Sequence, residues 1–358
     1  MSPSQHDLAG LGRRARVTGA ASALPAPVSQ AALWRDVFAH RYGGSARAEA
    51  IWSAVGVETR HAAIDPRLED VSSWGTGARM QRYVAEALPL ATDAAAGALA
   101  AAGVRAEDVG LLALASCTGY ATPGLDILAA RELGLPDGLQ RLLVGHMGCY
   151  AAVPALGAVA DAVTARGLVS LLVCVELPSL HVQAPCPEVQ QVVAHALFSD
   201  AATAVVVDAE GAGLEVLDLA ARTDVEHHRD MTWDVTDLGF RMGLSPRVPQ
   251  VLARHVRPLV DELLGRHGLR ASDVAGWAIH PGGPRIVEVC ADRLGLDDAD
   301  VAASLATLRD HGNCSSATVL LVLEELRRTR PLAPGEHVVA LAFGPGLTLY
   351  GALLRQAG

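Results

Sequence analysis

One structural pattern occurs twice in this chain, and the repetition restricts the fold more than any other feature. In each copy an apolar segment, predicted to be a strand, ends in a polar turn; these segments are residues 109–117 and 274–280. A predicted helix follows and ends on a similar phrase, Arg-Glu-Leu-Gly-Leu at 131–135 and Asp-Arg-Leu-Gly-Leu at 292–296. The agreement in order indicates a duplicated α/β unit.

A glycine turn with a reactive side chain follows in both copies. The first turn is Gly148-Cys149 and the second is Gly312-Asn313. Cys149 lies 32 positions after Cys117, and Asn313 lies 33 positions after His280, so the copies also keep their spacing. If the copies pack about a pseudo-twofold axis, both turns come to one site.

Each turn opens a helix rich in small residues, and each helix leads into an apolar strand. The helices are predicted at 150–165 and 315–328, and the strands at 169–175 and 337–342. Continuous apolar strands that alternate with helices are typical of sheets buried on both faces. We predict two fused α/β halves, with the boundary near residues 208–214.

The composition restricts the compartment. A chain of 358 residues with 51% hydrophobic and 19% charged residues forms an ordered protein with a large core. Residues 1–26 lack the apolar stretch of a signal peptide, and the longest apolar runs, such as 168–175, have the length of a strand. We therefore expect a cytoplasmic protein with no membrane partner. Six cysteines without a Cys-x-x-Cys pair are expected to be free thiols and not to form a metal site.

The charged residues restrict the ligands. A net charge of −10 argues against nucleic acid as a partner. All 29 basic residues are arginines, so Schiff-base and pyridoxal phosphate chemistry cannot occur, and we predict no cofactor. Any phosphate group on a ligand would have to be held by arginine or by backbone N–H groups.

Three distant residues are the parts needed to place a thiolate next to an imidazole and to bind an oxyanion. Cys149 precedes a predicted helix, whose N-terminal N–H groups and dipole would lower the pKa of the thiol, and an adjacent imidazolium of His280 would lower it further. The N–H groups of His280 and Asn313 could stabilise a developing oxyanion. Taken singly, each residue has a simpler interpretation: a packed core thiol, a turn histidine and a helix N-cap. The duplicated unit explains all three together.

These motifs resemble those of the thiolase-fold condensing enzymes, and specifically the type III polyketide synthases of the chalcone synthase-like group. The resemblance runs from about residue 60 to residue 354. The matching motifs, in order, are Cys117-Thr118-Gly119, Thr122-Pro123-Gly124-Leu125-Asp126, Gly148-Cys149, Ala196-Leu197-Phe198-Ser199-Asp200, His280-Pro281-Gly282-Gly283, Gly312-Asn313-Cys314-Ser315-Ser316 and Phe343-Gly344-Pro345-Gly346-Leu347-Thr348.

The resemblance implies a fold and a set of roles. The fold would be five-layered, αβαβα, with a half at 1–212 that carries the cysteine and a half at 213–358 that carries the histidine and asparagine. Cys149 would carry the acyl chain as a thioester, and His280 and Asn313 would promote decarboxylation of a malonyl thioester.

The resemblance also implies substrate-binding residues and a partner. Phe198 would be one of two gatekeepers between a CoA tunnel and the polyketide cavity. Gly344 and Pro345 would shape the cavity floor, with Ser315 beside them. Members of the family are homodimers in which the turn at Thr122 reaches the neighbouring cavity.

At several positions the chain departs from the plant-type members. The second gatekeeper is Met242 where they have phenylalanine, and Pro178 and His181 replace threonines. A methionine would admit a different acyl group, and His181 could shorten the cavity or hydrogen-bond a polyketide carbonyl. Of the basic residues near the CoA phosphates, only Arg47 and Arg60 have plausible counterparts. We expect CoA thioesters as acyl donors, with an acyl carrier protein as the alternative.

The sequence therefore predicts a homodimeric type III polyketide synthase. It would extend an acyl starter with malonyl-CoA by decarboxylative Claisen condensation and release a cyclised phenolic or pyrone product. Three alternatives stay open: a β-ketoacyl-carrier-protein synthase III-like enzyme that condenses once, an acyltransferase that does not extend the chain, and a non-catalytic partner subunit. The starter, the number of extensions and the cyclisation mode do not follow from the sequence.

Overall fold

Two sets of four strands with the same order and directions form most of one nine-stranded sheet. A computed structural model describes residues 12–184, 186 and 188–358. The first set is β4 (Leu111–Ser116), β6 (Ser170–Glu176), β7 (Ala201–Asp208) and β1 (Arg16–Ala23). The second set is β11 (Val274–Ile279), β12 (His337–Gly344), β13 (Thr348–Gln356) and β8 (Leu214–Thr223).

Strand pairing shows the relation between the sets. In each set the first two strands are parallel, and the other two neighbouring pairs are antiparallel. β1 and β8 join the sets through a short antiparallel contact, in which Arg16 pairs with Glu215 and Val17 with Leu214. This order, with the join in its middle, is the pseudo-twofold arrangement expected from the duplicated sequence.

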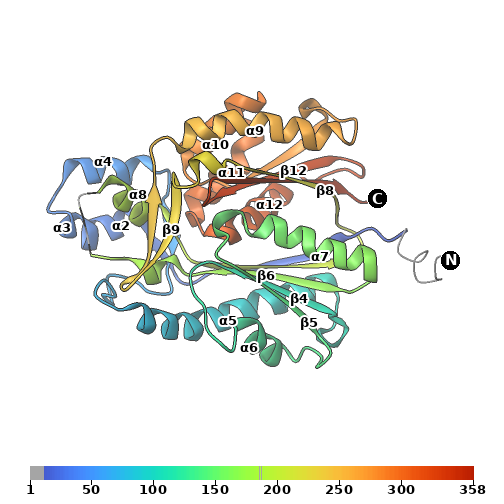
Figure 1. Ribbon diagram of the computed structural model, residues 1–358, viewed down its shortest axis with the longest axis horizontal. Helices are drawn as coiled ribbons and strands as arrows, with labels where there is room; N and C mark the ends of the chain where they lie inside the picture. Colours follow the sequence, from blue (N-terminus) through green and yellow to red (C-terminus); the bar gives the residue numbers. More distant parts are fainter. Residues whose placement is uncertain (1–11, 185, 187) are drawn as a thin grey trace.

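Helices form three layers around the two halves of the sheet (Figure 1). Helices α7 (Ala152–Arg166) and α12 (Thr318–Thr329) lie in the middle, and their apolar side chains share one core with both halves. Helices α5 (Thr76–Ala102) and α6 (Leu125–Leu133) cover one outer face; α9 (Val248–Gly265) and α10 (Pro284–Leu294) cover the other. The predicted five-layered α/β fold is confirmed.

The predicted elements are present, with two differences of detail. Both helices that follow the reactive turns begin as short 3-10 turns, η3 (Gly148–Tyr150) before α7 and η7 (Ser315–Ala317) before α12. The copies also differ before these turns, since the first has strand β5 (Gln140–Gly145) at the sheet edge and the second has helix α11 (Asp298–His311). The predicted boundary between the halves falls in the connection from β7 to β8.

Short elements cover the end of the sheet where the reactive turns lie. They are β2 (Pro27–Ser29), α2 (Gln30–Leu33), the π-helix η1 (Trp34–Phe38), α3 (Ala39–Arg41), α4 (Ala46–Ala54), β3 (Thr59–His61), α8 (Val189–Leu197) and the hairpin of β9 (Met231–Thr236) and β10 (Gly239–Leu244). In Figure 1 the hairpin stands beside α8 and faces the ends of the central helices. These elements enclose the candidate site.

Two helical segments of the described chain are long and apolar enough to cross a membrane by length and composition, namely α5 and the stretch Gly148–Arg166, which combines η3 and α7. Both are accounted for by packing in the fold. Helix α7 lies between the sheet halves, and the apolar face of α5 packs on strands β1, β6 and β7.

Candidate active site

Cys149 follows Gly148, a position where both the backbone conformation and the packing favour glycine. Strand β5 ends at Gly145, and Gly148 then adopts a left-handed φ of 75°. A Cβ atom on Gly148 would lie 2.4 Å from Cδ of Pro345, which is closer than two carbon atoms that are not bonded to each other can approach. The close contact holds the Gly344-Pro345 loop against the turn, and a Cβ on Gly344 would likewise lie 3.2 Å from the backbone nitrogen of Cys149. The thiol is buried at the start of the central helix layer.

His280 occupies the first position after strand β11. Its backbone N–H donates to the carbonyl of Leu341 (2.8 Å), so strand pairing with β12 continues up to this residue. The side chain is almost fully buried, and its Nδ1 atom has no hydrogen-bond partner among the described residues. A buried polar atom without a partner is unfavourable by itself and is typical of a site that binds a ligand.

Asn313 is fixed by its neighbours in a defined orientation. Its Oδ1 atom accepts hydrogen bonds from the backbone N–H of Ser315 (2.9 Å) and the hydroxyl of Thr318 (3.4 Å), which leaves the amide NH₂ group as the donor, and the side chain also forms a hydrogen bond with Cys149. Its backbone pairs with the segment around Phe198, because Asn313 N–H donates to Leu197 (2.9 Å) and Ser199 N–H donates to Asn313 (2.9 Å). The asparagine can therefore offer a hydrogen-bond donor at a fixed place.

The three side chains line one cavity of about 630 Å³. They span 164 positions of the sequence, from Cys149 to Asn313, and the structure brings them together through the two halves. The other walls are mainly aliphatic: Ile51, Val55, Val189, Val193, Leu197, Leu244, Val248, Leu252, Ile286, Leu347 and Leu349. A thiol, an imidazole and an amide donor in a mostly apolar cavity can perform acyl transfer.

Burial sets the protonation states of the resting pair. It raises the pKa of the Cys149 thiol to about 12, although hydrogen bonds from Ser315 oppose the rise. It also lowers the pKa of His280 to about 3. Both shifts favour the uncharged thiol and imidazole at neutral pH, which runs against the thiolate–imidazolium pair expected from the sequence. A helix dipole contributes at most about 2 kcal/mol, whereas full burial shifts a pKa by up to ~5 units, so burial wins.

A buried carboxylate organises the floor below Cys149. Glu176, at the end of β6, accepts hydrogen bonds from the backbone N–H of Cys117 (3.0 Å), the hydroxyl of Thr118 (2.8 Å) and the hydroxyl of Ser316 (2.5 Å). The thiol of Cys117 lies 3.1 Å from the hydroxyl of Ser315. Burial raises the pKa of Glu176, and these donors oppose the rise.

The predicted substrate-binding residues lie on both sides of the nucleophile. Phe198 and Met242 line the 630 Å³ cavity and also a second space of about 20 Å³ on the inner side of Cys149. Pro178, Ser315 and Pro345 line only this inner space of the two. Gly344 packs behind the Cys149 turn. Thr122 is exposed and lines neither space.

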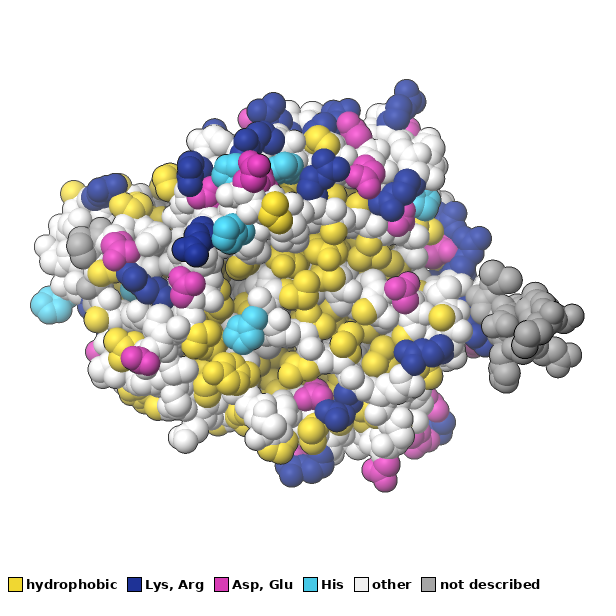
Figure 2. Space-filling model, viewed as in Figure 1, with side chains coloured by type: hydrophobic (Ala, Val, Ile, Leu, Met, Phe, Trp, Pro, Cys, Tyr) yellow, Lys and Arg dark blue, Asp and Glu magenta, His cyan; other side chains and the backbone are white. Residues whose placement is uncertain are grey.

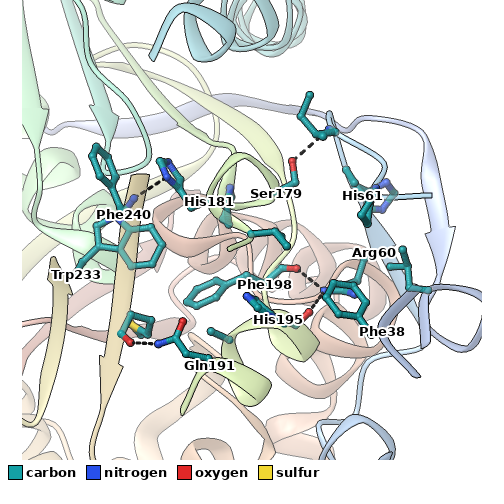
Figure 3. Close-up of a pocket in the computed structure, with 18 residues that line it drawn as sticks. Phe38, Arg60, His61, Ser179, His181, Gln191, His195, Phe198, Trp233 and Phe240 are labelled. Carbon is teal, nitrogen blue, oxygen red and sulfur yellow. Dashed lines mark hydrogen bonds between the residues drawn. The ribbon is translucent and has the colours of Figure 1, made fainter. Parts of the chain in front are cut away.

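Two predicted ligand contacts do not fit the observed positions. His181 has both ring nitrogens occupied, since Nε2–H donates to Thr118 (2.6 Å) and Nδ1 accepts from the N–H of Phe240 (2.9 Å), and burial lowers its pKa to about 4. It therefore has no free atom for a polyketide carbonyl. Arg60 is buried and donates to the carbonyls of His195 (2.6 Å) and Phe198 (3.1 Å) (Figure 3), so it supports the segment that carries Phe198 instead of facing a CoA phosphate.

Two residues of the site were missed by the sequence analysis. Arg285 lines the large cavity together with Arg47, and its place in the first turn of α10, after the His280 turn, could have indicated it. Trp233 lines the inner space and stands beside Phe240 and His181 in Figure 3. No local motif marks this tryptophan. No cluster of three metal-ligating side chains occurs within the described part of the chain.

Comparisons with known proteins agree with this geometry. The family model described as "Chalcone and stilbene synthases, N-terminal domain" matches residues 60–211, and the corresponding C-terminal domain matches residues 220–357. An alpha-pyrone synthesis polyketide synthase-like protein of Mycobacterium tuberculosis is 37% identical over 284 residues, which cover 77% of this chain and 72% of that protein. The 1,3,6,8-tetrahydroxynaphthalene synthase of Streptomyces peucetius is 36% identical over 315 residues, covering 85% and 82%.

A solved structure shows the same fold over nearly the whole chain. The 1,3,6,8-tetrahydroxynaphthalene synthase of Streptomyces coelicolor, a bacterial type III polyketide synthase, superposes with a TM-score of 0.90 at 27% identity, covering 96% of this chain and 99% of that one. The fold is thus that of the thiolase-like condensing enzymes. Within that class, the chain belongs to the chalcone and stilbene synthase family, the type III polyketide synthases.

Proposed function

We propose that this protein loads an acyl starter on Cys149 and extends it with malonyl-CoA by decarboxylative Claisen condensation, releasing a cyclised phenolic or pyrone product. The observation that carries the proposal is the single cavity lined by Cys149, His280 and Asn313. Membership of the type III polyketide synthase family supports it.

Loading begins from a neutral pair. The thiol proton of Cys149 passes to His280 as the sulfur attacks the thioester carbonyl of the starter, and the C–S bond to CoA breaks. The departing CoA thiolate takes the proton from His280. The acyl group is then bound to Cys149 as a thioester, and the histidine is neutral again.

Extension uses the same site with a different charge. When malonyl-CoA loses carbon dioxide, the electron pair of the broken C–C bond forms an enolate whose negative charge lies on the thioester oxygen. The amide NH₂ of Asn313, oriented by the N–H of Ser315, and a ring N–H of His280 can donate to that oxygen. The enolate carbon attacks the acyl carbonyl, and the Cys149 thiolate leaves and accepts the next chain.

We also propose CoA thioesters as the acyl donors and a homodimer as the assembly. Arg47 and Arg285 line the cavity and are its only cationic liners in the described part of the chain, which supports CoA phosphates at this mouth. We further propose a cytoplasmic homodimer. The edge strand β5 exposes Leu142 and Leu143, and Figure 2 shows hydrophobic side chains gathered over the middle of the same view of the molecule.

The test combines intact-protein mass spectrometry with product analysis. The protein is incubated with malonyl-CoA and a panel of acyl-CoAs, and Cys149→Ala is treated identically. We expect an acyl adduct that maps to Cys149, release of carbon dioxide and a cyclised product, all of which the variant lacks.

Other results would favour the remaining alternatives. An adduct without malonyl-dependent product would indicate an acyltransferase that does not extend the chain. A single uncyclised ketide would indicate a synthase III-like enzyme. The absence of any adduct, with either CoA or carrier-protein donors, would contradict the proposed function.

A further inference from the structure

Two histidines meet beside the turn that carries Asn313. His61 ends strand β3 and is buried, and His311 ends helix α11, two residues before Asn313. Nε2 of His61 lies 3.1 Å from Nδ1 of His311, and the two rings stack with 5.2 Å between their centroids. The contact joins segments that are 250 positions apart, one of which bears the donor proposed for the enolate.

The hydrogen-bond partners fix which nitrogen of each ring carries a hydrogen. Nδ1 of His61 lies 2.9 Å from the carbonyl oxygen of Pro25, which can only accept, so Nδ1 of His61 is the donor there. In a neutral ring Nε2 of His61 then has a lone pair and accepts. His311 must therefore donate from Nδ1, and two neutral rings form one complete N–H···N hydrogen bond.

The main chain of His61 holds the segment with which Asn313 pairs. Its N–H donates to the hydroxyl of Ser199 (2.8 Å), and its carbonyl accepts the N–H of Asp200 (2.9 Å). The N–H of Ser199 in turn donates to the carbonyl of Asn313 (2.9 Å). His61 thus reaches the Asn313 turn by two routes, through Ser199 and through the ring of His311.

The connection between His311 and Asn313 leaves little room for movement. Gly312 has a left-handed φ of 71°, and a Cβ atom there would lie 2.9 Å from Cβ of Ser199 and 3.1 Å from the carbonyl oxygen of Leu197. The turn is therefore packed directly on the 197–199 segment. A displacement of His311 would pass to Asn313 through a single residue.

We propose that His61 and His311 are positioning residues for malonyl-CoA decarboxylation, because their hydrogen bond holds the turn from which Asn313 donates to the enolate oxygen. This role rests on the proposed function and adds two residues to it. Neither histidine lines the 630 Å³ cavity, so the pair acts through Asn313. Loading of Cys149 does not need the Asn313 donor, so loss of the hydrogen bond should slow decarboxylation and leave loading nearly unchanged.

The pair also makes this step sensitive to acid. One added proton leaves a lone pair on one of the two facing nitrogens, whereas a second places two N–H groups and two positive charges against each other. Burial lowers the pKa of both His61 and His311 from its usual value, so the second proton is added only below about pH 6.5. The folded pair binds fewer protons than the unfolded chain does, so its contribution is present at neutral pH and is lost as the pH falls.

Nearby charges do not remove this sensitivity. Asp310 is paired with Arg309 (2.6 Å), and Glu325 is paired with Arg328 (2.8 Å), so each carboxylate already has its own cation. The charged groups on the elements around the pair are Glu58, Arg60, Asp200, Arg309, Asp310, Glu325 and Arg328.

Three variants separate the hydrogen bond from simple packing. His311→Leu removes the donor, and malonyl-CoA decarboxylation at neutral pH should fall about tenfold, while loading, followed by intact mass, changes little. His311→Asn places an amide N–H near the position of Nδ1–H and should restore most of the rate. His337→Leu, at a partly buried histidine in the first position of β12, controls for the loss of a histidine and should leave both steps unchanged.

The pH profile gives a readout that packing alone would not move. The amide of the His311→Asn variant can rotate and present its oxygen to a protonated His61, so this variant keeps its hydrogen bond in acid. Its decarboxylation rate relative to that of the unmodified protein should therefore rise about tenfold between pH 7.5 and pH 5. Circular dichroism at each pH confirms that both proteins are folded.

Several results would overturn the role of the pair and leave the proposed function intact. They are normal decarboxylation in a folded His311→Leu variant, equal losses in the leucine and asparagine variants, or a constant rate ratio across the pH range. If His311→Leu does not fold, the rate ratio for His311→Asn decides alone. Absence of decarboxylation by the unmodified protein would overturn the proposed function, and the role of the pair with it.

Discussion

The turn at Cys149 and the turn at Asn313 occupy equivalent places in the two halves, but they hold their side chains in different ways. The Cys149 turn is fixed through its backbone, where Gly148 packs against Pro345, and the side chains of Ser315 and Asn313 form hydrogen bonds with its thiol. At the Asn313 turn the side chain itself is fixed, through Oδ1 and the N–H of Ser315. One scaffold thus positions the sulfur through the backbone of its turn and the amide donor through the side chain itself.

The residues that follow strands β4 and β11 also occupy equivalent places in the two halves and differ in how many hydrogen bonds they form. Cys117, which follows β4, is tied into the hydrogen bonds of Glu176, Ser315 and Trp233. His280, which follows β11, leaves Nδ1 without a partner among the described residues. Of two equivalent positions, one serves the structure of the site and the other remains available for chemistry.

Of the changes considered for the two turns, replacing Asn313 should have the largest effect on activity. Asn313→Ala removes the amide donor, and the rate of malonyl-CoA decarboxylation should fall about 100- to 1,000-fold, the usual cost of one oxyanion donor. Loading of Cys149 should change little, because it does not need this donor. Carbon dioxide release and intact mass measure the two steps separately.

Asn313→Asp is the matched control for this variant. It keeps an oxygen for the N–H of Ser315 but loses the NH₂ group, so it should lose decarboxylation as severely as the alanine variant. If either variant also lost loading while remaining folded, the division of roles between the two turns would be wrong.

The second prediction concerns the charge state of Cys149. Because burial raises the pKa of the thiol to about 12, the thiolate fraction should rise about tenfold per pH unit throughout the range from pH 7 to pH 10. Alkylation of Cys149 by iodoacetamide, without any thioester present, should follow this rise, whereas a small free thiol levels off above about pH 8.5.

The background from the other thiols is measured on Cys149→Ala. A Cys149 rate that is already constant above pH 7 would restore the thiolate–imidazolium pair expected from the sequence. It would also mean that the helix N-terminus outweighs burial at this turn.

The sequence predicted the duplicated fold and the meeting of Cys149, His280 and Asn313, because these depend on apolar periodicity, glycine turns and spacing. It did not predict that burial shifts the pKa values of Cys149 and His280 toward their uncharged forms. The helix dipole can be inferred from a local pattern, but burial depends on the walls that distant segments supply. The same reason explains why the sequence did not predict the role of His181. Both of its ring nitrogens form hydrogen bonds with residues of other segments, Thr118 and Phe240.

Trp233 is the clearest example of a site residue that the sequence did not predict. The local sequence Thr-Trp-Asp is like that of many exposed strands. The indole lies near Cys149 only because the β9–β10 hairpin packs on the end of β4, where Trp233 donates to the carbonyl of Cys117. Residues within a turn could be predicted because their geometry is local. Residues that form cavity walls could not, because their positions depend on tertiary packing.

The smallest expected effect comes from the glycines that shape the first half. Gly148 and Gly134 both have a left-handed φ, 75° and 67°, but a Cβ on Gly148 would meet Pro345, whereas a Cβ on Gly134 would meet nothing within 4 Å. Gly134→Ala should therefore cost only the backbone strain, about 1–2 kcal/mol of unfolding free energy. Gly148→Ala should cost about 1–3 kcal/mol more through overpacking, and it should slow loading of Cys149 by displacing the turn. Denaturant unfolding of both variants measures the difference, and equal losses would show that the contact with Pro345 does not hold the nucleophile in place.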